Sequence, residues 1–143
     1  MSNNEQNKKR VLFLCTGNSA RSQMAEGFLK TLGGSNFTVT SAGTNPVGVN
    51  PLAVQVMAEV GIDISSQTSD AVTSELLANI DLLITLCGDA RENCPFVPVK
   101  VEKQHWPLED PARNEGSEEE KLERFRTIRD EIRKYVENLI TKS

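Results

Sequence analysis

The residues best suited to chemistry lie in one short loop that begins at Cys15 and ends at Arg21. An apolar segment leads into Cys15, and an amphipathic segment begins at Ser22. A loop between the end of a strand and the start of a helix points successive backbone N–H groups at one centre, and the helix dipole adds positive charge there. The same field stabilises a thiolate at the mouth of the loop. We therefore expect Cys15 to be a nucleophile that attacks a tetrahedral oxyanion bound in the loop.

The other loop positions suit this role. The guanidinium of Arg21 offers a planar pair of donors that matches two oxygens of a tetrahedral anion. Gly17 and Asn18 tolerate the positive φ that a tightly curved loop demands, and Ser22 is placed to donate a hydrogen bond to the Cys15 thiolate. A buried cysteine that only packs at a strand end is the alternative, and the strand–loop–helix context disfavours it. The expected anion-binding residues are Thr16, Gly17, Asn18, Ser19, Ala20 and Arg21.

Two further cysteines, Cys87 and Cys94, favour redox chemistry over simple hydrolysis. Cys87 follows the apolar segment 82–86, so two neighbouring parallel strands would bring it to the same sheet edge as Cys15. A thiol relay needs an attacking, a resolving and an outer thiol, whereas two incidental thiols are the alternative. An odd cysteine count argues against a structural disulfide framework. A four-ligand zinc set is also disfavoured, because the single histidine, His105, reads as a surface or packing residue, so we expect no metal centre.

The elements that must position these residues alternate between strand and helix patterns along the chain. A good helix start is formed by Asn50 and Pro51, and Ser117 with Glu120 forms a capping box. This alternation predicts an α/β fold, in which helices cover both faces of a parallel sheet. We expect one domain over residues 10–143 after a disordered tail over 1–9. The expected strands are 10–14, 37–41, 81–86 and 100–106, and the expected helices are 22–32, 51–60, a short one within 70–80, and one after 117.

The overall composition narrows the class of partner. The chain has 143 residues, which suits one domain, and its formal net charge is −4. No basic excess is available to neutralise phosphates, which argues against nucleic acid or a membrane surface as partner. The polar segment 1–10 lacks the apolar core of a signal peptide, and the apolar runs are too short to span a membrane. We expect a cytoplasmic monomer.

The loop resembles that of the low-molecular-weight protein tyrosine phosphatases and of their relatives, the thioredoxin-coupled arsenate reductases. The resemblance implies a single four-stranded parallel sheet in the order 2-1-3-4. Asp110 and Pro111 match a late Asp-Pro motif whose aspartate is the general acid, although a carboxylate in a turn is the alternative. The match covers nearly the whole chain after Arg10, and its further segments are 17–19, 22–26, 41–43, 61–65, 68–70, 85–90 and 93–95.

The segments around Cys87 and Cys94 match the reductases, so the resemblance implies reduction of arsenate to arsenite. Cys15 attacks arsenic, and Asp110 protonates the departing hydroxide. Cys87 then attacks the Cys15 adduct and releases arsenite, and Cys94 moves the resulting disulfide to the Cys87–Cys94 pair, which thioredoxin reduces. Arsenate and thioredoxin are the implied partners, and no organic cofactor is required. Many relatives carry another cysteine where this chain has Ala20, but each of the three redox roles still has a cysteine here.

Two other functions stay open at this point. A phosphotyrosine phosphatase would use the same loop, and weak phosphatase activity is expected beside reduction because phosphate fits there. The Asp-Pro motif nevertheless lacks the nearby tyrosines that phosphatases use against aromatic substrates. A non-enzymatic oxyanion-binding module is the second alternative. Some relatives also bind a monovalent cation beside the loop, for which a plain hydrogen-bond network is the alternative, and the matching residues are Asn18, Glu26, Ser41, Thr68 and Asp70.

Overall fold

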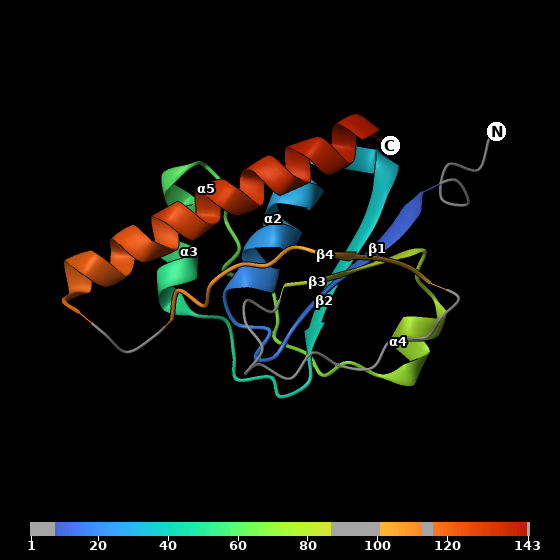
Figure 1. The fold of residues 1–143 in the computed structure, drawn as a ribbon, viewed down its shortest axis with the longest axis horizontal. Helices are drawn as coiled ribbons and strands as arrows, with labels where there is room; N and C mark the ends of the chain where they lie inside the picture. Colours follow the sequence, from blue (N-terminus) through green and yellow to red (C-terminus); the bar gives the residue numbers. More distant parts are fainter. Residues whose placement is uncertain (1–7, 87–100, 113–115, 143) are drawn as a thin grey trace.

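The computed structural model describes residues 8–86, 101–112 and 116–142. Four strands form one parallel sheet in the order β2-β1-β3-β4, as predicted (Figure 1). The strands are β1 (Lys9–Cys15), β2 (Phe37–Gly43), β3 (Leu82–Thr85) and β4 (Glu102–His105). The helices are α2 (Arg21–Gly33), α3 (Pro51–Glu59), α4 (Ser74–Ala78) and α5 (Glu118–Lys142), and a short 3-10 helix, η1 (Gly34–Asn36), follows α2.

Local side-chain chemistry sets the starts of the helices. The Asn50 side chain accepts a hydrogen bond from the Leu52 amide at 2.8 Å, which caps α3 ahead of Pro51 at its first position. The predicted capping box of α5 is present, because Ser117 Oγ accepts from the Glu120 amide and Glu120 Oε1 accepts from the Ser117 amide. Both predicted helix starts are therefore confirmed.

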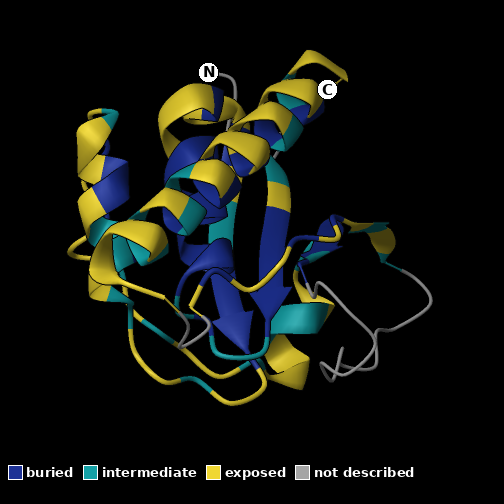
Figure 2. Cartoon of the chain, turned by 60° about the vertical axis from the view of Figure 1, so that its left-hand side comes forward, coloured by how far each residue is buried: buried dark blue, intermediate teal, exposed yellow. Residues whose placement is uncertain are grey.

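Side-chain alternation along β1 divides the core into two layers. Val11 and Phe13 belong to the larger cluster, which packs against α2, α3 and α5. Leu12 and Leu14 point to the opposite face and pack beside α4. Figure 1 shows α5 lying across α2 and α3 on one side of the sheet, with α4 on the other. Helices therefore cover both faces, and Figure 2 shows that the outward surface of α5 is exposed while its inner surface is buried.

Element boundaries differ from the predictions where long-range pairing decides them. The strand β1 already begins at Lys9, which lies inside the predicted tail 1–9, and residues 1–7 lie outside the described part of the chain. The short helix predicted within 70–80 is present as Ser74–Ala78 and is capped by the Thr73 side chain, while Ala71 before it forms an isolated bridge with Gly43. None of the described helices is long and apolar enough to cross a membrane.

The parallel pairing brings the carboxyl ends of three strands to one edge of the sheet. Cys15, the last residue of β1, lies beside Gly43 at the end of β2. On its other side, β1 pairs with β3 so that Leu14 lies beside Thr85. This edge, which open α/β sheets commonly use for ligands, carries the loop that joins β1 to α2.

Candidate active site

The loop from Cys15 to Arg21 forms one wall of a cavity of about 530 Å³. Asp110, far away in sequence, lies on the same cavity, so the structure brings together the predicted nucleophile and the predicted general acid. The segment 45–50 completes the wall. The lining residues are Cys15, Thr16, Gly17, Ser19, Ala20, Arg21, Asn45, Val47, Asn50, Asp110 and Ala112.

The carbonyl groups of the loop are held on its outer side by backbone donors of the segment 45–50. The carbonyl oxygen of Thr16 accepts from the Asn45 amide at 2.8 Å, and that of Ser19 accepts from the Asn50 amide at 2.9 Å. The carbonyl oxygen of Gly17 likewise accepts a backbone hydrogen bond in this segment at 3.1 Å. In a planar trans peptide the N–H points opposite to the C=O, so the N–H groups that follow these carbonyls point into the loop. This geometry directs backbone N–H groups as the predicted anion loop requires, and anion binding itself stays a prediction.

Positive φ occurs at one of the two loop residues for which it was predicted. Asn18 has φ 44°, whereas Gly17 has no positive φ. Asn18 is fully buried, and its side-chain Oδ1 accepts hydrogen bonds from Ser22 Oγ at 2.8 Å and from Gln23 Nε2 at 3.0 Å. Asparagine adopts the left-handed region more readily than most residues, and these side-chain contacts hold it there.

The predicted nucleophile and the hydroxyl that was expected to assist it are in contact. Cys15 is buried, with 2% of its surface exposed, and its Sγ lies 3.0 Å from Ser22 Oγ. Either atom can donate in this pair. A hydroxyl at this distance can hold a thiolate at the base of the cavity, because hydrogen bonding to the charged form favours it.

Arg21 is anchored by two segments outside the loop. Its Nη1 donates to the carbonyl oxygen of Leu86 at 3.1 Å and to that of Leu108 at 3.0 Å. The guanidinium is buried and lines the cavity. These bonds fix the orientation of the guanidinium in the cavity, and they also tie the chain two residues before Asp110 to the loop.

Asp110 is exposed at the rim of the cavity. Its Oδ1 accepts a hydrogen bond from the Ala112 amide at 2.9 Å, which holds the carboxyl group in a turn. The turn and the general acid are therefore compatible interpretations of Asp110, because the same turn places its carboxyl on the cavity that Cys15 also lines.

Cys87 and Cys94, predicted as the resolving and outer thiols, lie outside the described residues. The chain is described up to Leu86, whose amide donates to the carbonyl oxygen of Leu14 at 3.0 Å. Leu86 and Leu14 each immediately precede a cysteine in the sequence. The part of the relay prediction that concerns neighbouring strands is thus confirmed, and the thiol positions stay a prediction.

His105, which was predicted to be a surface or packing residue, and the neighbouring Trp106 lie outside the cavity lining. His105 is exposed, pairs through Nδ1 with Thr85 Oγ1 at 2.7 Å, and does not line the cavity. Trp106 is buried and stacks on Tyr135 with ring centroids 4.9 Å apart. These residues support the sheet edge and take no part in the site described here.

The residues that match a cation site form hydrogen bonds with one another and with protein donors. The Glu26 carboxylate accepts from Ser41 Oγ and from Lys30 Nζ, and Thr68 Oγ1 donates to Asp70 Oδ2. Lys30 already supplies a positive charge to the buried Glu26. Among the described residues, no group of three or more His, Cys, Asp or Glu side chains is placed to hold a metal ion. These contacts form a hydrogen-bond network, and the monovalent cation stays a prediction.

Three features of the site were not predicted from the sequence. The segment with Asn45, Val47 and Asn50 forms part of the cavity, and its only local motif, the helix start at Asn50, does not indicate a site. Gly43 approaches the loop so closely that a Cβ there would lie 2.6 Å from the Thr16 carbonyl oxygen. Gln23 is fully buried beneath the loop. The sequence signal that could have identified it is its position, because it directly follows Ser22 in the first turn of the helix.

The sequence of this chain is similar to those of known proteins. The family model described as low molecular weight phosphotyrosine protein phosphatase matches residues 10–143. An arsenate reductase of Bacillus subtilis (strain 168) is 56% identical over 124 residues, which covers 87% of this chain and 89% of that relative.

Solved structures agree with the sequence comparison. A structure of an arsenate reductase in the phosphate binding state superposes with a TM-score of 0.78 at 43% identity, covering 94% of this chain and 98% of that chain. A thioredoxin-dependent arsenate reductase of Corynebacterium glutamicum superposes with a TM-score of 0.64 at 30% identity. That likeness covers 91% of this chain and 62% of the other.

Proposed function

This chain belongs to the low molecular weight phosphotyrosine protein phosphatase family, and because the relatives just described are arsenate reductases, we propose that it reduces arsenate to arsenite. The observation that carries the proposal is the cavity on which Cys15, the inward N–H groups of the loop, Arg21 and Asp110 converge. Arsenate and phosphate are both tetrahedral oxyanions, so the same set of donors suits either ion.

The first step uses residues that the structure describes. The Cys15 thiolate attacks arsenic of the bound arsenate, and an S–As bond forms. The departing hydroxide takes a proton from Asp110 and leaves as water. The loop amides and Arg21 hold the remaining oxygens, whose charge they complement throughout the step.

The electrons come from two further thiols, and this part of the proposal rests on the sequence. Cys87 attacks Sγ of the Cys15 adduct, so that an S–S bond forms, the S–As bond breaks, and arsenic(V) leaves as arsenite, arsenic(III). Cys94 then attacks Cys87 and frees the Cys15 thiol, leaving a Cys87–Cys94 disulfide. Two electrons from a dithiol reductant reopen that bond.

We propose thioredoxin as this reductant. The thioredoxin-dependent reductase of Corynebacterium glutamicum, which shares the fold, supports the choice. Because the three thiols carry the electrons, the proposal requires no organic cofactor.

One coupled assay tests the proposal as a whole. Purified protein with arsenate, thioredoxin, thioredoxin reductase and NADPH should oxidise NADPH only when arsenate is present. Cys15→Ser should abolish this oxidation together with hydrolysis of an aryl phosphate, because both reactions begin with the same attack. Arsenite production by this variant would contradict the assignment of the nucleophile.

A second variant separates reduction from hydrolysis. Phosphatase activity is the second candidate function, and the relative in a phosphate binding state supports it. Cys87→Ser should lose arsenate reduction and keep the wild-type rate of aryl phosphate hydrolysis, since Cys87 is needed only after the adduct forms. Loss of both activities would assign Cys87 a different role.

A further inference from the structure

A continuous line of side-chain hydrogen bonds leads from the nucleophile into the protein beneath the loop. Cys15 Sγ lies 3.0 Å from Ser22 Oγ, which donates to Asn18 Oδ1 at 2.8 Å. Gln23 Nε2 donates to the same Asn18 Oδ1 at 3.0 Å and to the Asn18 carbonyl oxygen at 2.9 Å. Gln67 Nε2 in turn donates to Gln23 Oε1 at 2.8 Å. Cys15, Ser22, Asn18 and Gln23 are all buried.

Ser22 has a single hydroxyl proton and two neighbours that can accept it. When Cys15 is a thiol, its S–H can donate to Ser22 Oγ, and the Ser22 proton can then go to Asn18 Oδ1. When Cys15 is a thiolate, the charged sulfur is the stronger acceptor and draws the Ser22 proton to itself. Asn18 Oδ1 then depends on its other donor, which is Gln23 Nε2.

We propose that Gln23 is a positioning residue that lowers the free-energy cost of forming the thiolate at Cys15. Its amide keeps the buried Asn18 Oδ1 hydrogen-bonded while Ser22 turns toward the sulfur. Without that amide, forming the thiolate would leave a buried acceptor without a donor, which is unfavourable. This inference deepens the proposed function, but its readout is the reactivity of Cys15, which does not depend on arsenate being the substrate.

Charged groups near the line are the same in every variant used below. Among the described residues, Arg21 and Asp110 are the charged side chains that line the cavity with Cys15. Near the other end, Asn18 Nδ2 lies 3.5 Å from the Asp70 carbonyl oxygen. Glu26, one turn along α2, is directed to Ser41 and Lys30. Cys87 and Cys94 are replaced by serine throughout, so that Cys15 is the only thiol that reacts.

The test is the pH dependence of Cys15 alkylation by iodoacetamide. Gln23→Met keeps the length of the side chain and removes its donors. Its alkylation midpoint should move up by about one pH unit, which is about a tenfold loss of thiolate below both midpoints. Gln67→Met, the matched control, removes a donor to Gln23 but none to Asn18 and should leave the midpoint in place. An unmoved midpoint in Gln23→Met, or an equal shift in the control, would overturn the proposal.

A double-variant comparison distinguishes this role from general loosening of the loop. In Ser22→Ala, Gln23 is the donor to Asn18 Oδ1 whether or not Cys15 is charged. Adding Gln23→Met to Ser22→Ala should therefore give no further shift of the midpoint. Additive shifts would show that Gln23 acts independently of Ser22 and would overturn the mechanism.

A measurement on the single-thiol protein avoids any loss of folding in Gln23→Met. The side-chain amide protons of Gln23, observed by NMR, should shift with the same midpoint as Cys15 alkylation. The signals of Gln67 should move less, and the Gln23 response should vanish in Ser22→Ala. Gln23 signals that do not respond to the titration of Cys15 would rule the proposal out.

Discussion

At the scale of single residues, Asp110 differs from Cys15 in exposure to solvent, although both line one cavity. It is exposed at the cavity rim, and Cys15 is buried at its base in contact with Ser22. A proton donor at the rim suits a leaving group that departs away from the sulfur. The Ala112 amide and the anchored Leu108 carbonyl fix the turn that carries this carboxyl.

We predict that Asp110→Asn slows formation of the Cys15 adduct by about 10²- to 10⁴-fold, the usual size of a general-acid effect. Asparagine keeps Oδ1 as the acceptor for the Ala112 amide, so the turn should survive while the transferable proton is lost. The measurement is single-turnover arsenate consumption. The neighbouring Glu109→Gln, outside the cavity lining, should react at the wild-type rate, and an Asp110→Asn rate within twofold of wild type would assign the proton to another group.

At the scale of elements, the loop is shaped by the strand beside it. The end of β2 approaches the loop at Gly43, where a Cβ would lie 2.9 Å from the Asn18 amide nitrogen and 2.6 Å from the Thr16 carbonyl oxygen. Both contacts are to backbone, which cannot move aside like a flexible side chain. The absence of a side chain at Gly43 is therefore a condition for the geometry of the anion site.

We predict that Gly43→Ala displaces the loop and weakens both anion binding and stability. Overpacking of this kind costs roughly 1–3 kcal/mol of unfolding free energy. Phosphate affinity by calorimetry and urea unfolding would measure the two effects.

Gly61→Ala is the control, because Gly61 has positive φ, open space where a Cβ would lie, and a position outside the segments that line the cavity. This control should lose stability and keep phosphate affinity. Equal phosphate affinity in both variants would show that the loop tolerates the added methyl group.

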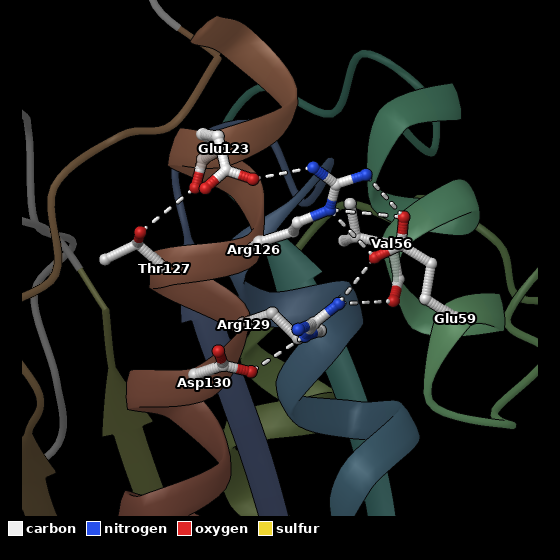
Figure 3. A network of polar contacts seen from close by, with 7 residues as sticks. All are labelled: Val56, Glu59, Glu123, Arg126, Thr127, Arg129 and Asp130. Carbon is white, nitrogen blue, oxygen red and sulfur yellow. Dashed lines mark hydrogen bonds and ion pairs between the residues drawn. The ribbon is translucent and has the colours of Figure 1, made fainter. Parts of the chain in front are cut away.

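At the scale of the whole molecule, an ion-pair network joins the last helix to the middle of the chain (Figure 3). The Glu59 carboxylate at the end of α3 accepts from Arg126 Nη2 at 2.8 Å and from Arg129 Nη1 at 2.9 Å. Arg129 Nη1 also donates to the Val56 carbonyl oxygen at 3.0 Å. The network holds α5 against α3 within the helical layer that covers one face of the sheet.

We predict a pH-dependent contribution of Glu59 to stability. The hydrogen bond from Arg126, followed by that from Arg129, lowers the pKa of Glu59 from its ordinary value. A lowered folded-state pKa means that the contribution is fully present above the unfolded carboxyl pKa of about 4.3 and is lost as the pH falls through the folded value. Glu59→Gln should therefore lower the free energy of unfolding at pH 7, and its difference from wild type should shrink in acid.

Urea unfolding between pH 3 and pH 7 measures this difference. Glu119→Gln, an exposed change in the first turn of α5, is the matched control and should show a smaller loss at pH 7. Added salt should reduce the Glu59 effect, because the network is partly exposed to solvent. A Glu59→Gln difference that stayed constant across this pH range would show that the carboxylate charge is not the cause.

The sequence by itself determined the elements and predicted the chemistry of the loop. Hydrophobic periodicity and the capping signals at Asn50 and Ser117 are local, so they predicted the helices correctly, and strand–helix alternation predicted the parallel sheet. The run from Cys15 to Arg21 predicted an anion loop for the same reason: its residues are contiguous. The strand order and the role of Asp110 came from family resemblance, since neither follows from local spacing.

Only the tertiary structure decided which partners each residue has. Positive φ fell on Asn18 and not on Gly17, because the buried Asn18 side chain has donors on Ser22 and Gln23. The sequence likewise did not predict three contacts of the loop. These are the anchoring of Arg21 to two distant carbonyls, the close approach of Gly43, and the hydrogen bonds from the segment 45–50 to the loop carbonyls. These contacts join residues far apart in the chain, and periodicity reports only which face a residue occupies, not what meets it there.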